Sequence, residues 1–399
     1  MTACSGDGDP AGMASGPSYY RDILPILNQH CAGCHREGGI GPFTLGSYED
    51  AVAHAQTMVL ATASRQMPPW GVDNSGDCNS YRDAQWLTDE QIELIGDWSE
   101  SGMAMGDPAD ALAPPERAAL EVGLTLDMEV EYMPNRRVDD DYRCFIMDPE
   151  LDHDAYVTGY SVRPGQPTIV HHVILFSLES DAAEQAVQNL DDAEDGPGYT
   201  CYGGPGTFDG IGLLAGWAPG TPATFYPDGT GPLISAGRKV VAQVHYNLHA
   251  GFAPDRTLID LQLSDSVTSR GLMFPAADFG LRLEPGLAYT ESEAEFSTAD
   301  LPVGSVKIRG VYPHMHTLGR TLRVEVERVD GSTVCVSDTP AWDFHWQRFY
   351  FFEDPIDIFR GDIVRIRCGY DTTSRTDVVR WGEGTQDEMC LNGMYATLF

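Results

Sequence analysis

Residues 28–37, NQHCAGCHRE, contain Cys31, Cys34 and His35 in the spacing C-x-x-C-H. In this pattern the two thiols attach a haem through thioether bonds, and the histidine becomes an axial ligand of the iron. A domain that encloses one haem needs about 100 residues, close to a typical single domain. Roughly three quarters of the 399 residues lie downstream of such a domain and must serve another purpose.

The sequence on both sides of this motif predicts helices. The segment YYRDILPILNQH places Ile23, Ile26 and Leu27 on one helical face and runs directly into the motif. We expect a second helix over 47–65, with Ser47 as its N-cap.

A third helix, in LTDEQIELIGDWSESG, is predicted to open with a capping box of Thr88 and Gln91 and to end at Gly102. The order of helix, attachment motif, helix and helix resembles the small class I cytochromes c. This resemblance implies an all-α cytochrome c domain over residues 17–112. In it, Pro42 would lie where a carbonyl group holds the imidazole of the axial histidine.

The sixth iron ligand is predicted to be Met67 in RQMPPW, because the two prolines that follow deny this loop a helical conformation. A thioether ligand raises the potential of the iron and suits electron transfer. His54, on the second helix, is the alternative ligand. Met58 lies within the same helix and is interpreted as core packing, and Met103 and Met105 follow the last helix.

The charge of the chain argues against nucleic acid as a partner. It carries 25 Lys and Arg against 60 Asp and Glu, a formal net charge of -35, whereas phosphate binding needs the opposite sign. We interpret this acidity as a well-solvated surface. No stretch approaches the roughly 18 uninterrupted apolar residues that would indicate a membrane span.

Nine cysteines are more than a reducing compartment normally tolerates. Haem is attached to C-x-x-C-H outside the cytoplasm, so we expect an exported protein, periplasmic or on the outer surface of a bacterium. The first residues, MTACSGDGDPAGMASG, lack an apolar signal core. They resemble the end of a lipoprotein signal, which would make Cys4 a lipid anchor and residues 1–16 a flexible tether. A disordered start with an incidental cysteine is the alternative.

From Pro114 onward the sequence changes to short β-rich runs broken by Gly, Pro and Asp. The runs are TIVHHVILFSL, RKVVAQVHYNLH, SVKIRGVYPHMH, RTLRVEVERV and DIVRIRCGY. Many short strands separated by turn residues are typical of β-sandwiches. The segment APPERA is interpreted as the hinge between the helical and the β-rich parts.

Histidines are unevenly spread through the β-rich part and form three pairs: His171 and His172, His245 and His249, and His314 and His316. Residues i and i+2 of a strand face the same way, so His314 and His316 can hold one ion together. Adjacent residues point to opposite faces, so His171 and His172 need a distorted backbone or an edge position to share a metal. Imidazoles without clustered thiolates favour copper or zinc, and an added thioether favours copper.

Four motifs, VHHVILF, AQVHYN, PHMHTLGR and DEMC, occur in this order and at compatible spacing in the copper type II ascorbate-dependent monooxygenases. This is the family of peptidylglycine α-hydroxylating monooxygenase and dopamine β-monooxygenase, and the resemblance covers about residues 119–399. It implies two copper ions, an electron-transfer copper and a copper at which O2 reacts. The implied ligands of the first are His171, His172 and His245, and those of the second are His314, His316 and Met389.

Gln243 matches a family position between the electron-transfer copper and the substrate, so the resemblance implies a role for it in catalysis. His249 has no family counterpart. We interpret it as structural, together with His153 and His345.

The resemblance also implies two disulfides. Cys144 with Cys201 matches a bridge of the first sandwich, and Cys368 with Cys390 brackets the loop that ends at Met389. Two cysteines remain, Cys78 and Cys335; a bridge between them is one alternative, and the sequence leaves their pairing open.

Two positions depart from the peptide-hydroxylating member of the family. Its basic residue two before the first histidine of H-x-H is Tyr312 here, and its tyrosine four after the ligand methionine is Gly393. A substrate carboxylate would lose both partners. The departure therefore predicts a neutral or apolar substrate.

Together these features predict a copper-dependent monooxygenase that hydroxylates a C–H bond of a small organic substrate with O2. The reaction needs two electrons from outside the substrate; ascorbate supplies them in the animal enzymes. Here we expect an external donor to supply them through the chain's own haem. The alternatives are a non-enzymatic haem and copper electron-transfer or copper-binding protein on the same fold, and a haem that senses rather than donates.

The predicted fold is multidomain: an all-α cytochrome c domain is followed by two all-β, jelly-roll-like sandwich domains. We expect the first sandwich, with the electron-transfer copper, at residues 119–269. The second, with the oxygen-reacting copper, is expected at residues 270–399.

Overall fold

The chain divides by its internal contacts into two compact units in the computed structural model. The first unit is Met1–Trp70 with Gln85–Arg117, and the second is Gly71–Ala84 with Ala118–Phe399. The structure describes residues 16–37, 39–114, 118–207, 209–344, 346–382, 384 and 386–398. The described helices include none that is long and apolar enough to cross a membrane.

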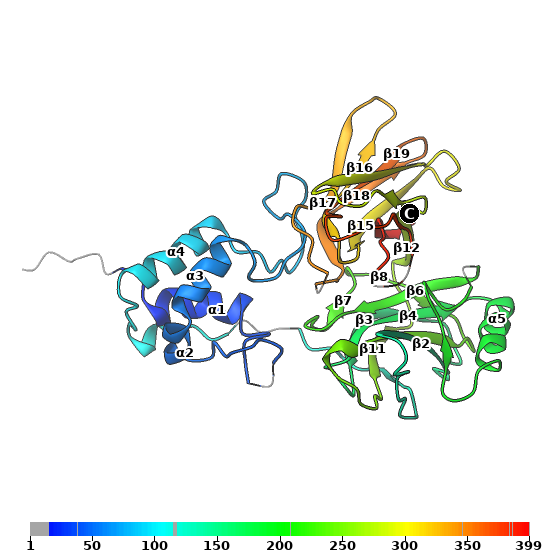
Figure 1. The fold of residues 1–399 in the computed structure, drawn as a ribbon, viewed down its shortest axis with the longest axis horizontal. Coiled ribbons are helices and arrows are strands. Elements are labelled where there is room, and N and C mark those ends of the chain that lie inside the picture. The colour runs from blue at the N-terminus through cyan, green and yellow to red at the C-terminus, as the bar shows by residue number, and fades with distance from the viewer. Residues whose placement is uncertain are drawn as a thin grey trace, which may run out of the picture. The chain divides into compact units, whose positions relative to one another are not determined.

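Helices make up the regular structure of the first unit (Figure 1). They are a π-helical turn Tyr19–Ile23 that continues into α1 (Leu24–His30), then α2 (Tyr48–Ala53), α3 (Ala55–Ala63), α4 (Asp89–Glu100) and a 3-10 turn Pro108–Asp110. Their buried faces form one core around Ile23, Leu27, Ile95 and Trp98. Met58 belongs to this core, which confirms its interpretation as a packing residue.

The predicted helix starts are confirmed. The Ser47 side chain accepts a hydrogen bond from the amide of Asp50, and Thr88 and Gln91 form both hydrogen bonds of the capping box. The prediction of one continuous helix over 47–65 is wrong, because the backbone leaves the helical region at His54, with φ -110° and ψ 9°. The His54 ring stacks there on Phe43 with 3.8 Å between ring centroids.

The second unit is built mainly of strands. All five predicted β-rich runs form strands, namely β4, β10, β15, β16 and β19. Its first half holds two sheets. One has the order β1 (Leu124–Asp127), β11 (Leu258–Ser264), β3 (Ala155–Arg163) and β7 (Thr224–Phe225), with β9 (Leu233–Ile234) also paired to β3. The other has the order β5 (Tyr199–Thr200), β2 (Asp140–Met147), β10 (Val240–Asn247), β4 (Val170–Leu178) and β6 (Ile211–Trp217); α5 (Asp181–Asp191) follows β4.

The second half holds two larger sheets and one small one. The first has the order β18 (Tyr350–Phe359), β15 (Ser305–His314), β21 (Leu391–Thr397), β12 (Ser269–Ala277) and β8 (Thr230–Gly231). The second has the order β14 (Thr290–Ser297), β19 (Ile363–Tyr370), β16 (Gly319–Glu327) and β17 (Thr333–Thr339), and β13 (Arg282–Leu283) pairs with β20 (Val379–Arg380). In Figure 1 the strands that follow β12 are coloured yellow to red, and the strands of the first half are mostly green.

The two halves of the second unit share one apolar core. Tyr160 and Tyr226 of the first half pack in the same buried cluster as Phe349, Phe351 and Tyr395 of the second. Strand β8 adds a parallel pairing to β12 across the same boundary. The halves are therefore joined by packing as well as by the chain.

The segment Gly71–Ala84, which we call the strap, belongs to the second unit although the helices of the first unit flank it in sequence. The amide of Asp73 donates to the carbonyl of Asp338, which lies on β17. Next to β18, the amide of Arg82 donates to Phe351 and that of Glu353 to Ser80. Because β17 and β18 are the edge strands of their sheets, the strap covers both open edges.

Three disulfides hold the second unit. The two implied by the resemblance, Cys144 with Cys201 and Cys368 with Cys390, are confirmed. The pairing that the sequence left open is also formed: Cys78 of the strap is bonded to Cys335 of β17, across 257 residues of sequence.

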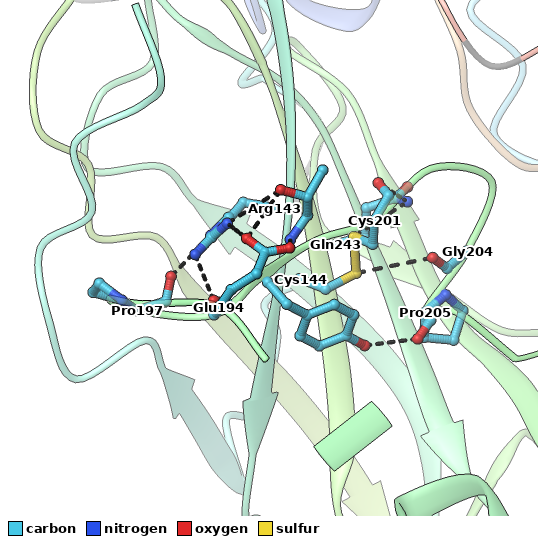
Figure 2. Close-up of a disulfide and its surroundings, with 11 residues drawn as sticks. Arg143, Cys144, Glu194, Pro197, Cys201, Gly204, Pro205 and Gln243 are labelled. Atoms are coloured by element: carbon cyan, nitrogen blue, oxygen red, sulfur yellow. Dashed lines mark hydrogen bonds and ion pairs between the residues drawn. A yellow bond between two sulfur atoms is a disulfide. The ribbon is translucent and has the colours of Figure 1, made fainter. Parts of the chain in front are cut away.

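Figure 2 shows how the loop after α5 is fixed to β2 around the first of these bridges. The guanidinium of Arg143 is buried and donates to the carbonyls of Pro197 and Gly198 at 2.9 and 2.5 Å. It also forms an ion pair with Glu194 at 2.5 Å. The disulfide and this charged cluster together attach the loop of residues 194–201 to β2.

We predict that the Cys78 to Cys335 bridge stabilises the second unit. Replacing both residues, Cys78→Ser with Cys335→Ser, should lower the free energy of unfolding by about 2 to 5 kcal/mol, the usual cost of removing a bridge from a secreted domain. Urea unfolding of the full chain measures this, and proteolysis within the strap should become faster. An unchanged midpoint and unchanged proteolysis would show that the strap's hydrogen bonds hold it without the bridge.

Candidate metal centres

A β-bulge in β4 brings adjacent histidines to one face. In the pairing of β10 with β4, His245 lies opposite His172 but Tyr246 lies opposite Val170, so His171 is the extra residue. The ring centroids of His171 and His172 lie 4.9 and 4.8 Å from that of His245. The predicted need for a distorted backbone is confirmed.

These three histidines can offer nitrogen atoms to one ion. One ring nitrogen from each lies within 4.8 Å of the others. The Nδ1 atoms of His172 and His245 are 3.4 Å apart. Burial is the main cause that lowers the pKa of both rings, so both imidazoles are neutral at pH 7. Three neutral imidazoles with no thiolate suit copper or zinc.

Side chains of β2 and β10 surround this group. Tyr142 stacks on His245 with 4.0 Å between centroids and 7° between planes. Asp140 Oδ1 lies 2.8 Å from His245 Nε2. Gln243 is buried, and its amide nitrogen lies 3.5 Å from the carbonyl oxygen of Cys201 and 3.8 Å from its sulfur (Figure 2). The role of Gln243 between metal and substrate stays a prediction.

A second group of donors lies where β15 ends. The rings of His314 and His316 are 5.2 Å apart at 85°. His314 Nδ1 lies 2.8 Å from Gln347 Oε1, and His316 Nδ1 lies 3.1 Å from the carbonyl of Asp387. Both rings therefore use Nδ1 as a hydrogen-bond donor and keep the Nε2 lone pair for another ligand. Burial, and to a smaller extent the charge of the neighbouring His316, lower the pKa of His314 to about 3.

One buried carboxylate connects this pair to Met389. Glu388 Oε2 accepts hydrogen bonds from the amides of His316 at 2.9 Å and of Met389 at 3.2 Å, and Oε1 accepts from Leu318 at 2.6 Å. Burial raises the pKa of Glu388 to about 7. The hydroxyl of Tyr370 donates to the carbonyl of Met389. Glu388 thus holds the backbone at His316 and the backbone at Met389 together.

The two donor groups are neighbours within the second unit. The ring of Phe344 stacks on His171 at 4.9 Å and lies 6.1 Å from His316. The positive forms of His171 and His245 contribute to lowering the pKa of His314. Sequence reasoning missed Phe344, because an aromatic residue in an irregular loop follows no periodic pattern.

Tyr312 and Gly393, the two residues that differ from the peptide-hydroxylating enzymes, are paired across neighbouring strands. Tyr312 of β15 lies opposite Gly393 of β21. A Cβ atom at Gly393 would lie 3.2 Å from Met273 Sδ and 3.4 Å from Tyr312 Cβ, so these side chains already fill the place of a larger residue. The Tyr312 ring packs 4.9 Å from that of Phe349. This side of the His314 strand is lined by aromatic and thioether groups.

His249 and His153 are not members of the two histidine groups described above. His249 is exposed in a 3-10 turn after β10, and His153 is exposed and paired with Asp152, whose hydrogen bond raises the pKa of the ring. His345 lies outside the described residues, as does Cys4.

The cysteines and the histidine of the C-x-x-C-H motif lie in the first unit. Among the described residues, Cys31 and Cys34 are the cysteines outside disulfides. His35 Nδ1 lies 3.0 Å from the carbonyl of Phe43, which leaves Nε2 for a metal. The expectation that Pro42 provides this carbonyl is corrected by one residue. Met67 is 37% exposed, and no described contact brings it to His35.

Comparisons with known proteins point in one direction. Residues 288–396 match the family described as Copper type II ascorbate-dependent monooxygenase, C-terminal domain. The chain is 24% identical to tyramine beta-hydroxylase of Caenorhabditis briggsae, over 79% of this chain and 54% of that protein. It is 24% identical to dopamine beta-hydroxylase of Rattus norvegicus, over 63% and 42%. It is 25% identical to peptidyl-glycine alpha-amidating monooxygenase of Mus musculus, over 63% and 24%.

These matches support a relationship to the copper monooxygenase family. The chain spans about half the length, or less, of the curated relatives named above. The solved structure of allantoicase aligns with a TM-score of 0.19 at 10% identity, over 66% of this chain and 80% of that one. This similarity is too low to indicate a shared fold.

We predict that Glu388 is required for the stability of the second donor group. Glu388→Gln replaces a carboxylate oxygen by an amide nitrogen, which cannot accept the backbone hydrogen bonds. Each buried group left without a partner costs about 1 to 3 kcal/mol. Urea unfolding of the metal-free protein measures the loss, with Glu353→Gln, an exposed glutamate on β18, as the matched control. Equal midpoints for both variants would contradict the prediction.

Proposed function

We propose that this protein is an exported copper-dependent monooxygenase that inserts one oxygen atom from O2 into a C–H bond of a small organic substrate. One observation carries the proposal. A bulge turns two adjacent histidines toward a third, and this group lies next to a second pair of histidines linked to a methionine. The family match covers the half that contains the second pair.

His171, His172 and His245 would bind the electron-transfer copper. His314, His316 and Met389 would bind the copper at which O2 reacts, because two imidazoles with one thioether favour copper over zinc. When bound, the two ions supply one electron each to O2. The chain's own residues hold the ligands: Gln347 and the carbonyl of Asp387 orient the second pair, and the Phe344 ring contacts His171 and lies 6.1 Å from His316.

The substrate class follows from the residues beside His314. Tyr312, Met273 and Phe349 offer apolar surface at the places where the peptide-hydroxylating enzymes would bind a carboxylate. The hydroxyl of Tyr312 is buried, and burial raises its pKa, so it stays neutral. A neutral or apolar substrate fits this wall, whereas a charged one would be buried without a partner at a cost of several kcal/mol, on the order of that for an unpaired ion.

The first unit would supply the electrons. We propose a class I-like cytochrome c domain at residues 17–112, with one haem held by Cys31 and Cys34. His35 and Met67 are its proposed axial ligands. Inserting one oxygen atom reduces O2 by four electrons, two from the C–H bond and two from outside. An external donor would deliver the latter through the haem, one at a time.

The three disulfides fit an oxidising compartment outside the cytoplasm. A periplasmic or outer-surface location, with a lipid anchor at Cys4, remains part of the proposal. The domain limits 119–269 and 270–399 are also part of the proposal, and they place one copper in each half of the second unit.

The decisive test follows the haem in the presence of O2 and reductant. The purified protein should contain two coppers and one low-spin haem, and its reduced haem should reoxidise rapidly with O2 and substrate only when both copper sites are filled. His314→Ala should abolish this reoxidation while leaving the haem spectrum unchanged. His249→Ala, which removes an exposed histidine from the turn after β10, is the matched control and should behave as the wild type. Zinc or a single ion, or identical rates in wild type and His314→Ala, would favour a non-enzymatic protein.

A separate prediction concerns the sixth ligand of the haem. Met67→Ala should abolish the absorption band of the oxidised protein that reports a thioether bound to iron, because the substitution removes the predicted thioether ligand. Optical spectra of the purified variant check this, with Met105→Ala as a control that removes another exposed methionine of the same unit. A band that survives Met67→Ala and disappears in His54→Ala would identify the histidine as the ligand.

A further inference from the structure

We propose that Asp140 is a positioning residue for the three-histidine group: its carboxylate holds the Nε2–H of His245 and thereby directs the Nδ1 lone pair of this ring toward the metal. The inference rests on the proposed function, in which His171, His172 and His245 bind copper. It adds a residue that belongs to none of the four motifs.

The strand register places Asp140 where this contact forms. In the antiparallel pairing of β10 with β2, His245 lies opposite Tyr142 and Asn247 lies opposite Asp140. Residues two apart share a face, so Asp140 and Tyr142 lie on the face of His245. Asp140 Oδ1 is 2.8 Å from His245 Nε2, and the side-chain amide of Asn247 donates to the same oxygen at 3.3 Å. Asn247 therefore helps to hold the carboxylate.

This contact determines the tautomer of His245. A neutral imidazole has one N–H donor and one lone pair, and an ionised carboxylate can only accept. The proton of His245 must therefore lie on Nε2, which leaves the lone pair on Nδ1. That atom is 3.4 Å from Nδ1 of His172. Stacking on Tyr142 fixes the plane of the same ring.

The arrangement predicts two effects on bound copper. A carboxylate behind a ligating histidine raises the basicity of the ligand, and losing such a partner typically weakens metal binding about 10- to 100-fold. Its negative charge also favours Cu(II) over Cu(I). Asp140 should therefore set both the affinity and the potential of the site that passes electrons.

The experiment uses the full chain with His314→Ala and His316→Ala, so that added copper reports the three-histidine group. Asp140→Ala should weaken Cu(II) binding about 10- to 100-fold in competition with a chelator of known affinity. Asp140→Asn, which keeps the shape and removes the charge, should shift the midpoint potential to a more positive value and change the Cu(II) EPR spectrum. Asp139→Asn removes the same charge from an exposed neighbour and should change neither.

A purely structural role for Asp140 would lower the melting temperature of the metal-free protein and leave the potential and EPR spectrum unchanged. That result, or wild-type copper affinity in both folded variants, would overturn the proposal. If Asp140→Ala does not fold, the potential of Asp140→Asn decides.

The tautomer gives a test that needs no metal. Nitrogen NMR of the metal-free protein should show the proton of His245 on Nε2 in the wild type and a mixture of tautomers in Asp140→Ala or Asp140→Asn. If the wild type binds no copper but shows this tautomer, the proposed function fails while the contact stands. The same tautomer in wild type and variants would overturn the positioning role itself.

Discussion

The packing between the two halves of the second unit brings the two candidate donor groups next to each other. Large aromatic side chains from both halves form one buried cluster, in which Tyr226 packs 4.8 Å from Tyr395 and 5.6 Å from Phe351. Their hydroxyl groups keep hydrogen-bond partners inside the core: Tyr395 donates to Thr230 and Tyr226 to the carbonyl of Leu214. A buried phenol retains its stabilising contribution only when its polar end is satisfied in this way. With the halves held together, Phe344 reaches His171.

Burial has the same chemical consequence in both donor groups. Removing imidazoles from water lowers their pKa and keeps them neutral, and neutral imidazole is the form that binds a metal. One ring nitrogen each of His245, His314 and His316 is held by a fixed partner, namely Asp140, Gln347 and the carbonyl of Asp387 respectively. Supporting residues of this kind orient the ligands and tune the metal. The donor groups are therefore organised by the fold before any ion binds.

The strap gives the chain an unusual connectivity. The first unit is interrupted at Trp70 and resumes at Gln85, and the residues between form part of the second unit. They are held by a disulfide and by hydrogen bonds to the edge strands β17 and β18. The chain thus passes between the units three times rather than once.

Local patterns in the sequence determined much of this protein. Short β-rich runs separated by turn residues predicted the strands, capping residues predicted the helix starts, and the family resemblance implied the two donor groups among three pairs of histidines. The disulfides Cys144 to Cys201 and Cys368 to Cys390 followed from a family resemblance rather than from the residues alone. These features depend on residues close in sequence or on motifs shared with relatives.

Only the tertiary structure decided the remaining features, because they depend on residues far apart in the chain. The bulge at His171 is defined by its register against β10, and Cys78 finds Cys335 across 257 residues. Glu388 accepts hydrogen bonds from backbone groups about 70 residues earlier, and Asp140 meets His245 through strand pairing. No local pattern marks such a residue, since an isolated acidic side chain reads as solvent-exposed until the fold buries it beside a donor.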